Sequence, residues 1–324
     1  RFNRATAQLN LAWLLNQQEL PAESQAQAVA GINEFIGLAG DYPEDVRYTA
    51  GEAAGRVIVA EVLRDHGDRE NSLAMLEIAI QELAGLGQDA RPQDFLQRAV
   101  AVSLLASTRG AASEVSTDEQ RATAVPLFDA AGELFEDLLA SDSPLPRERD
   151  AAAWNDFRRA QHLSSAGDSA AATAAMQLAL SRFEAPPENA VFLEHIAWFL
   201  LQSPDPDLRD VAVAVDLLER ALKLAPRNVR CLETSALAHL RQGDVNTARE
   251  RLRTAISVAG HPSAGRPSAG RPSAGQLFLT AIIERRADQQ DESAAALSEA
   301  SKLMQSRSPG NPRLQLLHRE AAAN

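Results

Sequence analysis

The chain has 324 residues, of which 45% are hydrophobic and only 5% aromatic, so it can bury a large core built mainly of aliphatic side chains. Its formal net charge of −12 argues against nucleic acid and anionic lipid as partners, because both would repel an acidic protein. The single cysteine excludes an internal disulfide framework, and no run of about 18 apolar residues predicts a membrane span. We therefore expect a cytoplasmic protein, or an extracytoplasmic one if a membrane segment precedes residue 1.

One set of spacings between small and apolar residues recurs along the chain. A small residue is followed by a turn residue 7 positions on, and by small or apolar residues 12, 16 and 19 positions on. Small side chains at these places let two antiparallel helices approach closely, so each copy predicts a helical hairpin. The complete copies start at Ala60, Ala160 and Ala236, and the partial copies start at Ala12, Ala197 and Ala281.

Two hairpins depart from this spacing. In the third, residues 95–107 predict a first helix, residues 109–120 a polar loop, and residues 124–131 part of a second helix. In the fifth, the alanines expected 12 and 19 positions after Ala197 stand 17 and 24 positions after it. The same shift of five in both distances indicates a single insertion, which we place in residues 202–210.

A low-complexity segment separates the last hairpin from the others. Residues 261–275 consist of three copies of a five-residue block that ends in Pro-Ser-Ala-Gly. Such a composition has nothing to bury and predicts a flexible linker. The sequence therefore predicts helical repeats in residues 1–260, this linker, and a last hairpin with a polar tail in residues 276–324, whose end could form a capping helix.

The recurring spacing resembles the tetratricopeptide (TPR) repeat, a helix–turn–helix unit of about 34 residues. The resemblance implies an all-α, right-handed α-solenoid of about six to seven TPR-like hairpins. In such an array the first helices of the hairpins line a concave inner groove, which is where a partner would bind.

Residues 193–228 resemble something narrower, the TPR region behind the kinase domain of large bacterial serine/threonine protein kinases. The resemblance rests on Ala197, Trp198, Leu200, Pro204, Asp205, Pro206, Leu208, Arg209, Asp210, Ala214, Val215, Ala221, Leu224, Ala225 and Pro226. A more diverged similarity covers residues 41–83. The chain begins with Arg1 rather than methionine, so the resemblance implies a bacterial protein with a kinase domain before residue 1. The sequence itself contains no Gly-rich loop, HRD or DFG motif.

The sequence offers no catalytic constellation, no metal-ligand spacing and no cofactor motif. Its six histidines include no pair at metal-binding spacing, and a partly buried, hydrogen-bonded role is expected for His195 and His239. Cys231 is expected to be a small packing residue rather than a reactive thiol. The candidate groove residues on predicted first helices are Glu61, Arg64, Gln161, Arg230 and Glu233. The alternative for these five is an ordinary solvated helix face.

Taken together, these features predict a protein–protein interaction module that binds a helix or an extended segment of a partner in its groove. The alternative is the regulatory or sensory C-terminal region of a serine/threonine kinase, so whether the parent protein is an enzyme stays open. A transcription-regulator or secretion accessory module is a third class, which no motif favours. The sequence predicts no particular partner and no oligomeric state.

Overall fold

The structure is a computed structural model, and every regular element among the described residues is a helix. No β-strand occurs in that part of the chain, which confirms the predicted all-α class. The chain divides into two compact units, Arg1–Ala185 and Pro186–Asn324, and each is described by itself. The described residues are 1–17, 21–65, 67–110, 123–141, 144–183, 189–203, 206–260, 272–307 and 311–323.

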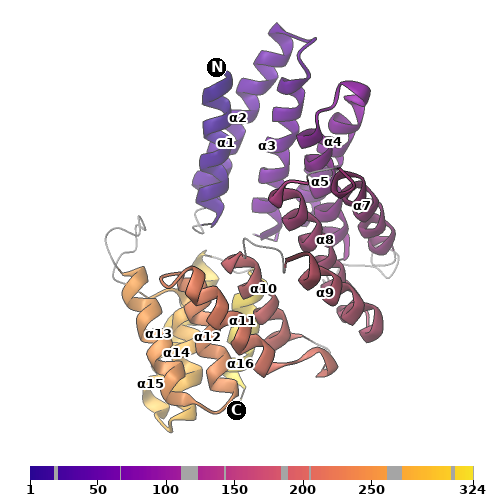
Figure 1. Cartoon of the computed structure of the whole chain (residues 1–324). Coiled ribbons are helices and arrows are strands. Elements are labelled where there is room, and N and C mark those ends of the chain that lie inside the picture. Colours follow the sequence, from indigo (N-terminus) through magenta and orange to yellow (C-terminus); the bar gives the residue numbers. More distant parts are fainter. Residues whose placement is uncertain are drawn as a thin grey trace. The chain divides into compact units, whose positions relative to one another are not determined.

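The described residues of unit 1 form a row of four helical hairpins, drawn in indigo to magenta in Figure 1. The two helices of each hairpin pack side by side, and each second helix packs on the first helix of the next hairpin. The 3-10 helix η1 (Gly87–Asp89) precedes the third hairpin. The hairpins are α1 (Phe2–Gln17) with α2 (Pro21–Asp41), α3 (Val46–Asp65) with α4 (Arg69–Gly85), α5 (Pro92–Gly110) with α7 (Ala124–Leu139), and α8 (Pro146–Ser165) with α9 (Ser169–Phe183).

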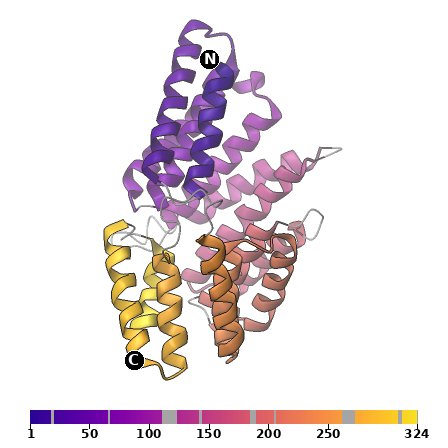
Figure 2. The same cartoon turned by 90° about the vertical axis from the view of Figure 1, so that its left-hand side faces the viewer.

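The described residues of unit 2 form three further hairpins and one additional helix, visible in salmon to yellow in Figure 2. The 3-10 helix η2 (Pro206–Leu208) lies within the turn of its first hairpin. The hairpins are α10 (Ala190–Gln202) with α11 (Val211–Leu224), α12 (Val229–Arg241) with α13 (Val245–Ala259), and α14 (Ala274–Arg286) with α15 (Gln290–Arg307). The helix α16 (Pro312–Ala322) follows. The described residues thus form seven TPR-like hairpins, as the spacing predicts.

The helices of each hairpin meet through the predicted small residues. Ala160, Ala172, Ala236 and Ala248 are completely buried. The last small position of the repeat, 19 residues after the first, is more restrictive in the first hairpin, because a Cβ atom on Gly31 would lie 2.7 Å from Leu9 Cδ2. Side-chain size at these contacts therefore sets how closely the two helix axes approach.

Left-handed backbone closes the turn of four hairpins at the same position of the repeat. The φ angles of Gly67, Gly167 and Gly243 are 85°, 83° and 87°, and Asp288 takes the equivalent place in the last hairpin with a φ of 60°. Glycine adopts this conformation without steric cost, whereas aspartate tolerates it at some cost. In the sixth hairpin the amide of Asp244, which follows Gly243, donates to the carbonyl oxygen of His239 at 2.9 Å.

A buried serine joins the two helices in three hairpins. The Ser72 Oγ donates to the carbonyl oxygen of Ala60 at 2.8 Å, and Ser24 and Ser293 make the corresponding bonds to the residues 12 positions before them. Other hairpins have alanine here, so the position requires a small side chain, and the serine hydroxyl is satisfied by a carbonyl close to it.

The insertion in the fifth hairpin agrees with the sequence, whereas residues 109–110 of the predicted loop and 274–275 of the predicted linker belong to the helices α5 and α14. In the fifth hairpin α10 ends at Gln202 and α11 begins at Val211, so the insertion lies in the turn. Most of the predicted loop 109–120 and of the predicted linker 261–275 lies outside the described residues, and the division based on that linker stays a prediction. The described part of the chain contains no helix with the length and apolar character needed to cross a lipid bilayer.

Candidate functional site

The five predicted groove residues all lie on first helices of hairpins. Glu61 and Arg64 are on α3 and Gln161 is on α8, whereas Arg230 and Glu233 are on α12 of unit 2. Gln161 and Arg230 are exposed, and the other three are half-buried. Their role in binding stays a prediction, and Arg230 is the one that lies in the polar network described next.

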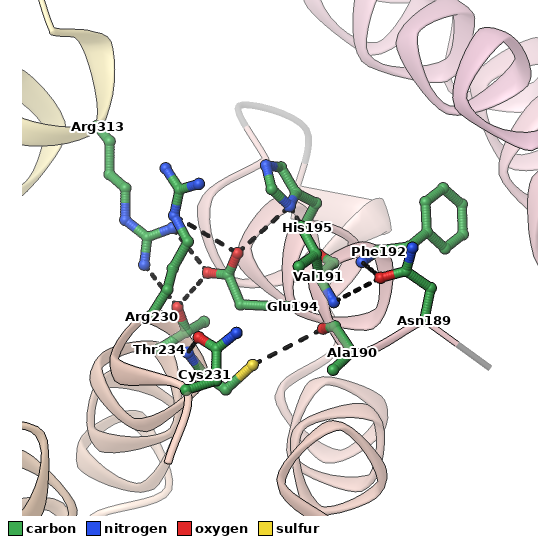
Figure 3. A network of polar contacts seen from close by, with 11 residues as sticks. Asn189, Ala190, Val191, Phe192, Glu194, His195, Arg230, Cys231, Thr234 and Arg313 are labelled. Atoms are coloured by element: carbon green, nitrogen blue, oxygen red, sulfur yellow. Dashed lines mark hydrogen bonds and ion pairs between the residues drawn. The ribbon is translucent and has the colours of Figure 1, made fainter. Parts of the chain in front are cut away.

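A buried carboxylate on α10 is the centre of the polar network shown in Figure 3. Glu194 is completely buried, and its Oε1 accepts a hydrogen bond from Arg313 Nη1 at 2.7 Å and another from the Thr234 hydroxyl. Arg313 Nη2 also donates to Thr234 Oγ1 at 2.6 Å, and Arg230 Nε lies 3.8 Å from Glu194 Oε2. Side chains from α10, α12 and α16 therefore share one desolvated ion pair.

The charges around Glu194 decide its protonation. Burial by itself would raise the pKa of this carboxyl, but the nearby positive charge, that of Arg313 above all, lowers the pKa to about 2. The neighbouring His195 has a lowered pKa because burial disfavours its charged form, and its Nδ1 lies 2.7 Å from the carbonyl oxygen of Val191. Glu194 is thus a permanent anion at neutral pH and requires a cation beside it.

Cys231 lies at the edge of this network and behaves as a packing residue. Its side chain is buried, and the Sγ donates to the carbonyl oxygen of Ala190 at 3.7 Å. Burial raises the pKa of the thiol to about 12, so the reactive thiolate is suppressed at neutral pH.

A second set of polar contacts lies at the other end of α16. The Glu320 carboxylate accepts from Arg241 Nη2 at 2.7 Å and from Gln202 Nε2 at 3.3 Å. Arg285 on α14 donates to the backbone carbonyls of Glu320 and Ala321 at 2.8 and 2.7 Å. Carbonyls in the last turn of a helix lack amide donors from a following turn, so Arg285 caps the C-terminus of α16 by donating to them.

Apolar and aromatic contacts connect the two polar ends. Leu317 and Ala321 of α16 are each only 2% exposed. The His318 ring packs on Phe278 of α14 with 5.5 Å between centroids, and the Arg313 guanidinium lies 3.9 Å from the centroid of the Trp198 ring. This stacking adds a cation–π contact to the ion pair at the start of α16.

The contacts define a helix-binding face, by which we mean the surface formed by α10, α12 and α14, the three first helices of unit 2. The start of α16 touches the first half of α10, and its end touches the last residues of α10 and α12. The helix α16 therefore runs along this face in the same direction as the first helices. In unit 2 the surface expected to bind a partner holds a helix of the chain itself.

Sequence reasoning missed most of this arrangement. Glu194 carries a signal, because it is the single acidic residue in the apolar run Ala190–Gln202, and a buried carboxylate needs a cation. Arg313 and Glu320 carry none, since nothing in the local sequence connects them to residues about a hundred positions earlier. Among the described residues no group of three or more His, Cys, Asp or Glu side chains could hold a metal ion.

Similarity to known proteins was found among solved structures. No protein-family model matches this sequence, and no curated protein matches it. Similar solved structures include a tetratricopeptide repeat protein from Parabacteroides merdae, at 10% identity and a TM-score of 0.44, covering 99% of this chain and 100% of that one. Yeast Tom70 is 13% identical with a TM-score of 0.42, covering 98% of this chain and 75% of that one. BtubC from P. vanneervenii is 12% identical with a TM-score of 0.38, covering 87% and 90%.

Similarity at this level carries no argument about function. The class of protein follows from the chain's own geometry, which is an all-helical array of TPR-like hairpins with small buried residues at the repeat positions.

Proposed function

We propose that this chain is a protein-recognition module that binds segments of partner proteins on the faces of its first helices. The observation that carries the proposal is the docking of α16 on the helix-binding face. That docking combines a buried ion pair at one end, a capped C-terminus at the other and apolar contacts between them. A surface able to hold one helix in this way has the chemistry needed to hold another, which is a recurring mode of peptide recognition.

The predicted groove residues extend the proposal to both units. Glu61, Arg64 and Gln161 are the candidate contact residues of unit 1, and Arg230 and Glu233 are those of unit 2. Each unit contributes one acidic and one basic side chain, so these residues would contribute orientation and selectivity rather than general affinity for one kind of charge.

A selection experiment tests the proposal directly. A displayed library of helical peptides is selected on the full chain, and the ligands are mapped by hydrogen–deuterium exchange. We expect protection on first helices, and weaker binding after Arg230→Glu on α12. Arg253→Glu on α13 is the matched control, since it changes an arginine that is also exposed but lies on a second helix. Protection confined to second helices, or turnover of a small molecule with no peptide ligand, would contradict the proposal.

The kinase-associated role remains the second candidate, and the structure explains the residues that suggest it. Arg209 Nε donates to the carbonyl of Ser203 at 2.7 Å, Asp210 caps α11 by accepting from the Val213 amide at 2.9 Å, and Leu208 is buried. The resemblance thus rests on residues that build the fifth hairpin. The sequence before residue 1 decides this candidate, because a Gly-rich loop followed by HRD and DFG motifs would establish the kinase.

A further inference from the structure

We propose that α16 is a displaceable internal occupant of the helix-binding face, and that the partner is a protein helix with the same four-residue signature. The signature is a basic residue, a leucine four positions on, an acidic residue seven positions on and a small residue eight positions on. In α16 these are Arg313, Leu317, Glu320 and Ala321. The inference rests on the proposed function, and it specifies the partner and the regulation of that same surface.

Two charges of α16 complement the helix-binding face but oppose the dipole of α16 itself, whereas a third, that of Arg319, is placed as the dipole favours. Arg313 lies in the first turn of α16 and Glu320 in the last, which is the reverse of what the helix dipole favours. On the helix-binding face the same two charges meet Glu194 at one end and Arg241 at the other, at 2.7 Å each. The face therefore favours a bound helix that is basic toward its start and acidic toward its end.

The helix α16 does not occupy the position that the first helix of a further hairpin would take. Earlier in unit 2 each first helix packs more extensively on the preceding second helix than on the preceding first helix. The helix α16 does the opposite, because it packs more on α14 than on α15 and its side chains reach α10 and α12. It thus lies across three hairpins, as a bound ligand would, instead of continuing the array.

The short length of α16 makes it easier for a partner helix to displace it from the helix-binding face. It has 11 residues, and isolated helices shorter than about 12–15 residues are marginal in water. Its helical state therefore depends on docking. The free energy needed to order α16 weakens its binding to the helix-binding face. A partner helix that is already folded does not carry this cost, so it can compete with α16 even though α16 is tethered to the chain.

A labelled peptide of residues 311–323 tests the proposal on the full-length chain. In the wild type the tethered α16 competes with the peptide at high effective concentration. Arg313→Ala with Glu320→Ala weakens the tethered helix at both ends, so we expect the double variant to bind the wild-type peptide at least about tenfold more tightly than the wild type does. Arg319→Ala is the matched control, because this arginine is exposed and donates a hydrogen bond to Gln315 of its own helix. It should leave the affinity of the wild type unchanged.

A control peptide and a milder variant complete the test. A peptide with alanine at both signature charges should bind none of the chains, and Glu320→Ala alone provides a milder variant should the double variant lose helicity by circular dichroism. Equal binding of the peptide to wild type and double variant, or binding to neither folded chain, would overturn the proposal. Library ligands that protect first helices but do not compete with this peptide would remove the inference and leave the proposed function standing.

Discussion

Replacing Arg313 by alanine is expected to lower the free energy of unfolding of unit 2 by up to about 3–5 kcal/mol, the usual cost of breaking a buried ion pair. The reason is geometric. Arg313 Nη1 lies 2.7 Å from a carboxylate on a residue with no exposed surface, and removing it leaves Glu194 charged and desolvated. The loss has a ceiling, because undocking of α16 would let water reach Glu194 and limit the cost to the free energy of docking.

A double-mutant cycle separates the ion pair from ordinary packing. Glu194→Gln removes the buried charge but keeps an acceptor for Thr234, so Arg313→Ala should cost much less when it is combined with Glu194→Gln than when it is made alone. We expect a coupling energy of about 2–3 kcal/mol between the two positions, as for residues in one polar network. Arg319→Ala, on the exposed side of the same helix, should show no coupling to Glu194→Gln.

The dependence of stability on pH provides an independent measure of the ion pair between Glu194 and Arg313. The pKa of Glu194 is lowered from 4.5 to about 2, a difference that corresponds to about 3 kcal/mol. Because the folded-state pKa lies below the unfolded one, this stability is present above pH ~5 and is lost as the pH falls toward 2. Glu194→Gln should therefore flatten the decline in stability over this range.

Guanidinium unfolding followed by circular dichroism gives the stabilities, and hydrogen–deuterium exchange reports the amides of α16 directly. In Arg313→Ala these amides should exchange faster, while those of α1 to α9 exchange as in the wild type. A cost below about 0.5 kcal/mol for Arg313→Ala, additive with that of Glu194→Gln, would refute the reasoning, because a pair so weakly coupled cannot hold α16 in place.

Three further predictions concern the hairpins and are measured by the same unfolding assay. Gly243→Ala should destabilise by about 1 kcal/mol and Asp288→Gly should stabilise by about 0.5–1 kcal/mol, since both residues have left-handed φ angles. Ser72→Ala should cost at most about 1 kcal/mol, because it removes one hydrogen bond to Ala60 and introduces the residue that other hairpins carry. Burial raises the pKa of Asp156 from 3.8 to about 6, so its contribution to stability falls as the pH rises from about 4 to 6, and Asp156→Asn should remove that fall.

Each of these predictions has a contrary result. A gain in stability on Gly243→Ala would show that the turn does not require left-handed backbone. A loss above about 3 kcal/mol on Ser72→Ala would mean that the hydroxyl, and not the size of the side chain, holds the two helices together. An unchanged pH dependence after Asp156→Asn would contradict the assigned pKa.

The hairpins were predictable because their determinants are local. The alanine pattern around Ala236 and Ala248 spans only 12 positions, and the glycine at Gly243 lies between them, so a short stretch specifies both helices and the turn that joins them. The insertion of the fifth hairpin was equally readable, since it shifts two spacings by the same amount.

By itself, then, the sequence determined an array of six to seven helical hairpins, because small residues at fixed spacing act within about 20 positions. It also located the turns at Gly67, Gly167 and Gly243. Only the tertiary structure decided what covers the first helices of unit 2. Arg313 and Glu194 are 119 positions apart, and a pairing over that distance depends on how three hairpins stack and where α16 then lies. Local sequence records neither the neighbour that a buried charge finds nor the face on which a short helix docks, since both arise only when distant segments pack together.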